Sequence, residues 1–174
     1  QSLRVLLEAD FRANRGGLLA TDRPEAVGNI ETALSSVLNA FHSLYDAVEK
    51  QLKSQPIDWH SVGELAIVLA IRNARHHNKA NRIRTLYTYH AHEAPKPTKT
   101  LNYVLIDFPA LDEGADTFDV CLSWGDLSSL LQMPKAESRI ASETVKVIRK
   151  YLHSENFEFY AQTHGVPPSR VFFN

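Results

Sequence analysis

The segment Arg72–His77 brings together side chains suited to acid–base chemistry on a phosphate group, because it reads Arg-Asn-Ala-Arg-His-His. A histidine titrates near neutral pH and can take or give a proton. An arginine can hold a phosphate through two parallel hydrogen bonds, and an amide can orient an oxygen. These residue types favour phosphodiester cleavage, which needs no metal ion when the 2′-hydroxyl of RNA is the nucleophile.

Helical spacing decides which of these side chains share a face. Arg72 and His76 are four residues apart, as are Asn73 and His77, so each pair lies on one side of a helix. Arg72 and His77 diverge by roughly 140° on an ideal helix. They converge if the helix end is distorted or if a second chain brings a matching set. A polar helix end, favoured by the helix dipole, is the structural alternative.

The elements before and through this segment are predicted to be helical. The run Leu65–Ile71 is apolar nearly all round, which predicts a buried central helix that ends in the polar segment. Upstream, apolar residues recur at steps of three and four over Val27–Leu52, which predicts a helix over about 24–54 with Asp22 at its start. A shorter helix is expected at the N-terminus, ending at Gly16–Gly17.

The pattern changes after residue 81. Leu86–Tyr89 and Leu101–Phe108 have β-type composition and are separated by a proline-bearing loop, which predicts an antiparallel hairpin. Thr117–Trp124 is expected to add a third strand. Two further helices are predicted, one from Ser123 to Leu131 and one from Pro134 to about residue 153.

The Arg72–His77 segment resembles the signature of the HEPN superfamily, in which an arginine and a polar residue precede a histidine. Arg72, Asn73 and His77 match these three positions, with four positions between the arginine and the histidine. The resemblance implies a small helical bundle with the motif near the end of a central helix. It also implies dimerisation that lines one cleft with two motifs, and metal-independent endoribonuclease activity in a toxin–antitoxin, CRISPR or phage-defence system.

The resemblance assigns roles to single residues. His77, favoured over His76 by the spacing, is expected to transfer protons; Arg72 is expected to hold the scissile phosphate. Asn73 is expected to orient the phosphate or His77. Neighbouring residues extend a basic run that attracts phosphates, and they are the expected substrate-binding residues: Arg75, His76, Lys79 and Arg82.

The expected architecture is mainly α, a HEPN-like helical bundle with an inserted antiparallel β-hairpin or small sheet. We expect a single domain over 1–174. Its bundle covers about 1–80 and 126–153, its β insertion covers about 84–124, and an irregular C-terminal tail covers 154–174. The expected partners are RNA, a second copy of the chain, and an antitoxin or regulatory protein.

Composition excludes several other classes. With 174 residues and a formal charge of −1, the chain fits one domain and is not basic throughout. The single cysteine, Cys121, cannot form an internal disulfide, which favours the cytoplasm, and no apolar run approaches the roughly 18 residues that cross a membrane. Because the chain begins with Gln1, we expect it to be a fragment or a processed product.

Two alternatives remain open at the level of sequence. The same bundle could be a non-catalytic binding or dimerisation module, with the Arg72–His77 segment making structural polar contacts. A metal-dependent enzyme could use His90, His92 and Glu93 together with the motif histidines. No complete ligand set has characteristic spacing, so we expect no metal and no cofactor.

Overall fold

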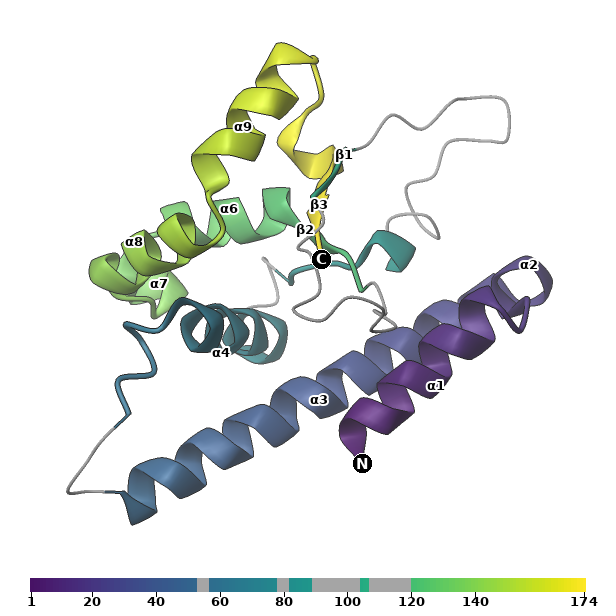
Figure 1. Ribbon diagram of the computed structural model, residues 1–174, viewed down its shortest axis with the longest axis horizontal. Helices are drawn as coiled ribbons and strands as arrows, with labels where there is room; N and C mark the ends of the chain where they lie inside the picture. Colours follow the sequence, from purple (N-terminus) through teal and green to yellow (C-terminus); the bar gives the residue numbers. More distant parts are fainter. Residues whose placement is uncertain (53–56, 78–81, 89–103, 107–119) are drawn as a thin grey trace, which may run out of the picture.

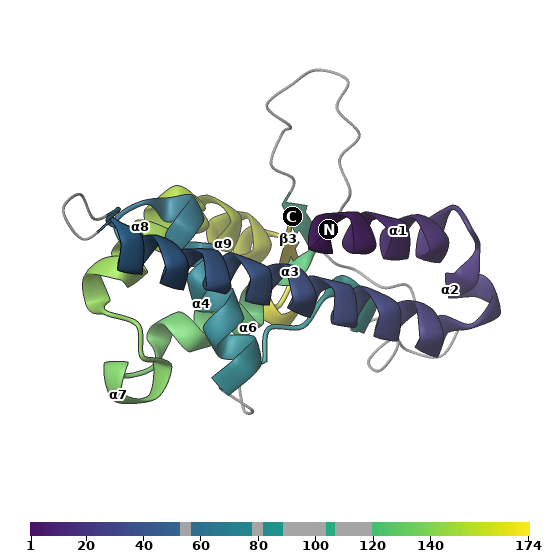
Figure 2. The same cartoon turned by 90° about the horizontal axis from the view of Figure 1, so that it is seen from below.

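A computed structural model describes residues 1–52, 57–77, 82–88, 104–106 and 120–174. It is mainly helical with a small sheet, which confirms the expected fold class (Figure 1). Helix α1 (Ser2–Asn14) and the short α2 (Leu18–Thr21) lead into the long α3 (Arg23–Gln51). Figures 1 and 2 show α1 running alongside the N-terminal half of α3, in the opposite direction.

Helix α3 forms where the periodicity predicts it. The side chain of Asp22 accepts a hydrogen bond from the backbone N–H of Glu25 at 3.0 Å, and this cap satisfies one of the unpaired donors of the first turn. The buried face of α3 follows the predicted apolar stripe through its N-terminal half. The buried residues are Ala26, Val27, Ile30, Ala33, Leu34 and Leu38.

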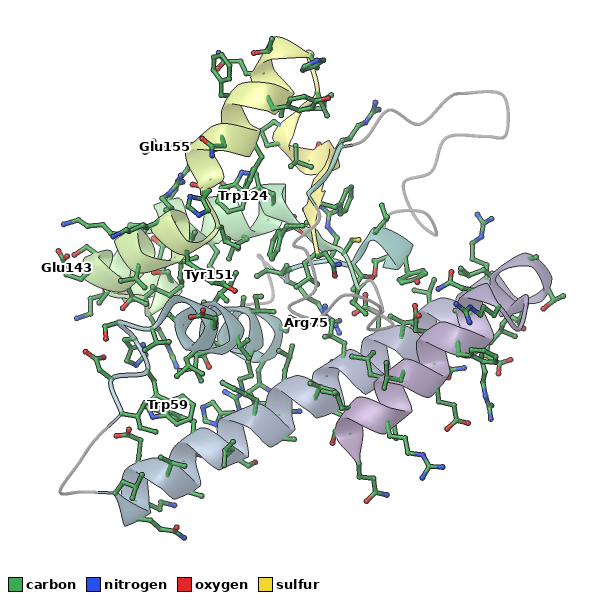
Figure 3. The ribbon with its side chains drawn as sticks, in the orientation of Figure 1. Trp59, Arg75, Trp124, Glu143, Tyr151 and Glu155 are labelled. Atoms are coloured by element: carbon green, nitrogen blue, oxygen red, sulfur yellow. The ribbon has the colours of Figure 1, made fainter. Side chains whose placement is uncertain are left out.

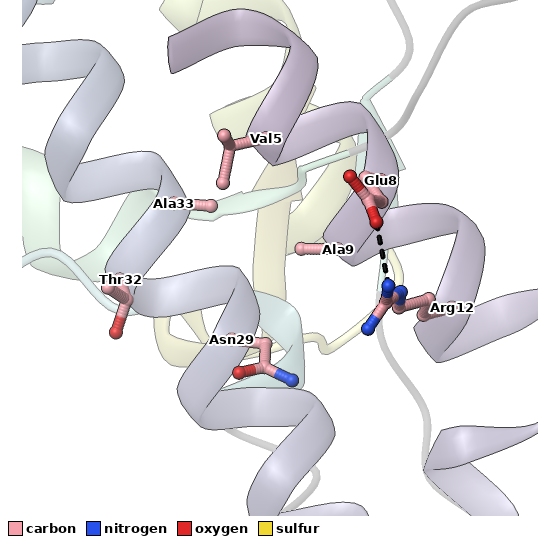
Figure 4. A pocket seen from close by; sticks show the side chains of 7 residues that line it. All are labelled: Val5, Glu8, Ala9, Arg12, Asn29, Thr32 and Ala33. Atoms are coloured by element: carbon pink, nitrogen blue, oxygen red, sulfur yellow. Dashed lines mark hydrogen bonds and ion pairs between the residues drawn. The ribbon is translucent and has the colours of Figure 1, made fainter. Parts of the chain in front are cut away.

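The contact between α1 and α3 leaves an open groove of about 290 Å³ beside it. Its rim carries an exposed ion pair in which Arg12 Nη2 lies 2.7 Å from Glu8 Oε1 (Figure 4). The other lining residues are mostly small and are drawn from both helices: Val5, Ala9, Asn29, Thr32 and Ala33.

Helix α4 (Gly63–His77) is the buried central helix that the sequence predicts. It packs against both α3 and α8 (Ser142–Tyr151). A Cβ at Gly63 would lie 2.4 Å from the Cβ of Tyr151, so only glycine lets the first turn of α4 approach α8 this closely. Despite its apolar core, neither α4 nor any other helix among the described residues has the length and hydropathy to cross a bilayer.

The sheet has three short strands, β1 (Val104–Ile106), β2 (Leu122–Ser123) and β3 (Val171–Phe173). Strand β3 lies in the middle, parallel to β1 and antiparallel to β2. One antiparallel bridge joins Thr85 to Leu122, which is a different pairing from the predicted hairpin of Leu86–Tyr89 with Leu101–Phe108. The hairpin prediction lacked the central strand, which comes from the C-terminus. All three residues of β3 are apolar and buried, so pairing on both sides satisfies their backbone groups.

The prediction of an irregular C-terminal tail over 154–174 is wrong. This segment forms α9 (Ser154–Thr163), a 3₁₀ turn (Pro168–Arg170) and β3. Phe157 and Ala161 are one helical turn apart and both buried, and the Phe157 ring meets the ring of Trp124 edge to face at 4.8 Å. Aromatic burial therefore orders the tail as regular structure.

The strand predicted over Leu86–Tyr89 is also wrong for the part that the structure describes. Residues 86–88 form a helical turn. The hydroxyl of Thr85 accepts a hydrogen bond from the backbone N–H of Thr88 at 3.2 Å and so acts as an N-cap. This local side-chain contact outweighs the strand preference of the segment.

The last two predicted helices have different outcomes. Helix α6 (Trp124–Gln132) begins as predicted, since the hydroxyl of Ser123 accepts from the N–H of Asp126 at 3.2 Å. The single helix predicted from Pro134 is two helices, α7 (Lys135–Ser138) and α8. Arg139 adopts a left-handed conformation with φ of 60°, which ends α7.

Candidate functional site

The polar motif occupies the last turns of α4, which is α-helical through His77. Ordinary helical spacing therefore applies, and Arg72 and His76 lie on the same face. The Arg72 guanidinium donates to the amide oxygen of Asn73 through Nη1 at 3.1 Å. The side chain of His77 lies outside the described residues.

A small polar cavity of about 40 Å³ lies between α3 and α4. Helix α4 contributes Arg72, Arg75 and His76, and α3 contributes Ser35, Leu38 and Asn39. Arg72 is half-buried and His76 is exposed, so the cavity is reached from the surface. A space of this size holds a few ordered waters or an oxygen of a bound anion.

Arg75 is a cation beside this cavity with only 4% of its side chain exposed. Its Nη2 forms an ion pair with Glu31 of α3, and its Nη1 donates to the carbonyl oxygen of Ile83 at 2.7 Å (Figure 3). Glu31 Oε1 also accepts hydrogen bonds from the hydroxyls of Thr85 and Thr88, the former at 2.7 Å. This Arg75–Glu31 network joins α3, α4 and the segment 82–88.

The charge of Arg75 sets the ionisation of Glu31. Burial alone would raise the pKa of the Glu31 carboxyl, because it disfavours the charged form. The positive charge of Arg75 and the hydrogen bonds from Thr88, Arg75 and Thr85 outweigh burial, so the pKa is lowered from its usual 4.5. Glu31 is therefore a fixed anion at neutral pH and holds Arg75 in place.

Segment 82–88 is anchored at two further points. Arg84 donates to Asp126 through Nε and Nη2, each at 2.9 Å, in a two-pronged contact with the first turn of α6. The Tyr87 hydroxyl donates to Asp10 at 2.8 Å, and burial together with that carboxylate raises the pKa of Tyr87. The end of α4 thus lies beside a rigidly held chain segment.

The structure brings together only some of the residues that the sequence nominates. Arg72, Asn73 and His76 lie together on the last turns of α4. Arg75, nominated as a substrate contact, is instead committed to Glu31 and Ile83, because its cation needs a buried partner. Arg82 is exposed near the site. Lys79 and the metal-ligand candidates His90, His92 and Glu93 lie outside the described residues.

Three α3 residues that were not predicted from the sequence also belong to this region: Glu31, Ser35 and Asn39. They follow one another at four-residue steps, so they share a face of the predicted helix. A row of polar residues beside the apolar stripe of this helix is the sequence pattern that could have identified them. Among the residues that the structure places, no group of three His, Cys, Asp or Glu is arranged to hold a metal ion.

Comparisons of the chain with protein-family models, with curated proteins and with solved structures give no match. The resemblance to the HEPN superfamily therefore rests on Arg72, Asn73 and His77 and on their place at the end of a buried helix.

Proposed function

We propose that this chain is a metal-independent endoribonuclease whose site lies at the C-terminal end of α4. The observation that supports this most is that Arg72 and His76 line one surface-accessible polar cavity, with Ser35 and Asn39 opposite them. A guanidinium supplies charge for a phosphate, and an imidazole supplies a group that titrates near pH 7. These two groups supply charge stabilisation and one of the proton transfers in the cleavage of RNA by its own 2′-hydroxyl.

The proposed reaction follows from these roles. Arg72 holds the scissile phosphate and stabilises the negative charge that develops on its oxygens. A histidine removes the proton of the 2′-hydroxyl, and the 2′-oxygen forms a bond to phosphorus. The bond from phosphorus to the 5′-oxygen breaks, and that oxygen takes a proton from a second acid. The products are a 2′,3′-cyclic phosphate and a 5′-hydroxyl. Asn73, which contacts Arg72, orients the guanidinium or the phosphate.

Two histidines compete for the proton-transfer role. His76 shares a face and a cavity with Arg72 of its own chain. His77 matches the motif spacing, and residues five apart on a regular helix are on different faces, so His77 would act with Arg72 of a second copy across a dimer. Because uncontrolled RNA cleavage is toxic to a cell, we place the proposed enzyme in a cytoplasmic toxin or phage-defence system under an antitoxin or regulatory protein.

The experiment is cleavage of a mixed RNA pool with EDTA present, by wild type, His76→Ala and His77→Ala. We expect cleavage by wild type and a loss of about 10²–10⁴-fold in the variant that lacks the proton-transfer group. Loss of cleavage in His76→Ala alone assigns proton transfer to His76 within one chain. Loss of cleavage in His77→Ala alone assigns proton transfer to His77 across a dimer. Equal activity of both variants and wild type would refute the proposed site.

A further inference from the structure

A second cluster of basic side chains, interleaved with glutamates, lies on α8, on the other side of α4 from α3 (Figure 1). Arg149 and Lys150 follow Lys146 at spacings of three and four residues, so these three lie along one side of α8, and His153 comes just after the end of the helix. They line a cavity of about 370 Å³ between α8 and the start of α9, together with Ser154, Glu155 and Asn156. We call this surface the α8–α9 face.

The cations of this face differ in how firmly they are held. Arg149 is fixed, since its Nη1 lies 3.3 Å from Glu158 Oε1 and its guanidinium carbon lies 5.7 Å from the centre of the Trp124 ring. Lys146 pairs with Glu143, but their side chains are 71% and 78% exposed, so a phosphate can replace this weak contact. Lys150 and His153 are exposed beside the same cavity.

Two exposed aromatic rings continue the α8–α9 face along α9. Phe159 is 71% exposed and Tyr160 is 49% exposed, which is unusual for rings of this size. They lie one helical turn beyond Glu155 and Asn156, on the side of α9 that lines the cavity. Figure 3 labels Glu143 in the first turn of α8 and Glu155 in the first turn of α9. The Tyr160 ring stacks on His164 with centres 4.0 Å apart.

We propose that the α8–α9 face binds single-stranded RNA. Lys146, Lys150 and His153 contact successive phosphates, and unpaired bases stack on Phe159 and Tyr160. Cations beside exposed rings suit a strand whose charge and bases are both accessible, whereas an RNA duplex hides its bases. The inference rests on the proposed function and names its substrate class. The face shares no residue with the cavity of Arg72 and His76, so the two sites can be tested separately.

The test is fluorescence anisotropy with a labelled single-stranded RNA of about 12 nucleotides, within the range that such surfaces cover. Lys146→Ala/Lys150→Ala should weaken RNA binding about tenfold. Because two phosphate contacts are lost, the slope of the logarithm of affinity against the logarithm of salt concentration should become smaller in magnitude by about 1.4. Phe159→Ala/Tyr160→Ala should weaken binding at least tenfold with an unchanged salt slope. Matched controls are Lys50→Ala and Phe11→Ala, which remove an exposed cation and an exposed ring elsewhere.

The outcomes separate this inference from the proposed function. Arg72→Ala should lose cleavage, and its RNA affinity should still fall about tenfold when Lys146→Ala/Lys150→Ala is added. Tight RNA binding that depends on the α8–α9 face, without cleavage by wild type, would refute only the nuclease. Three results would overturn the α8–α9 face as an RNA site. They are equal RNA affinities of both double variants and the control variants, no RNA binding by wild type, and competition by a poly-glutamate peptide as strong as that by unlabelled RNA.

Discussion

Replacement of Arg75 by alanine is expected to lower the free energy of unfolding by about 3 kcal/mol. The change leaves the Glu31 carboxylate without its ion-pair partner and the carbonyl of Ile83 without its donor. A charge left uncompensated in a largely buried position costs far more than the ion pair contributes when intact. Urea unfolding at pH 7, followed by circular dichroism, measures the loss. A loss below about 1 kcal/mol would show that the Arg75–Glu31 network does not hold the end of α4.

The control for this prediction is Arg12→Ala, which removes the exposed partner of Glu8. Arg12 and Glu8 are 66% and 53% exposed, so the loss should stay below about 1 kcal/mol. The two variants should also differ in pH dependence. Because the folded-state pKa of Glu31 is lowered, its stabilisation is present above the unfolded value of 4.5 and is lost as the pH falls through the folded value. The difference in the free energy of unfolding between wild type and Arg75→Ala should therefore become smaller at acidic pH.

Replacement of Arg72 by alanine is expected to reduce RNA cleavage about 10²–10³-fold, as the loss of one charge-stabilising donor does in other active sites. The reason is that Arg72 lines the cavity beside His76, and the developing charge on the phosphate needs a cation at that position. Initial cleavage rates with saturating RNA measure the effect. A rate within a factor of three of wild type would remove Arg72 from the mechanism.

A conservative variant keeps this test valid if the alanine variant folds poorly. Arg72→Lys retains the charge but loses the planar fork that holds two phosphate oxygens. It should therefore cleave at a rate between those of wild type and Arg72→Ala, while its circular dichroism spectrum and melting temperature stay close to those of wild type. A lysine variant with no activity but normal RNA affinity would show that two-pronged contact, and not charge alone, is required.

The helical part of this fold could be predicted because its signals are local. The period of the apolar residues and the Asp22 cap locate α3, and the apolar run Leu65–Ile71 locates α4 in the core. The sheet could not be predicted in the same way. Its central strand, Val171–Phe173, pairs with segments about 50 and 67 residues away in the chain, and no local pattern encodes such a partner.

In the candidate site, too, local features could be predicted from the sequence and contacts between distant residues could not. The order of Arg72, Asn73 and His76 on one helix follows from the sequence and from helical spacing. The burial of Arg75 does not, because its partner Glu31 lies 44 residues upstream and its acceptor Ile83 lies beyond the helix. The basic run alone therefore predicts that Arg75 contacts substrate, whereas the fold places the largely buried carboxylate of Glu31 beside it.

The most direct measurement is the cleavage, in EDTA, of one RNA oligonucleotide and of the same oligonucleotide with a single 2′-deoxyribose at the cleaved position. We predict that wild type cleaves the all-ribose strand and leaves a 2′,3′-cyclic phosphate, and that the 2′-deoxy strand stays intact at that position. No cleavage of either strand, cleavage of both, or cleavage only when a divalent metal ion is added would contradict a metal-independent ribonuclease built on Arg72 and its neighbouring histidine.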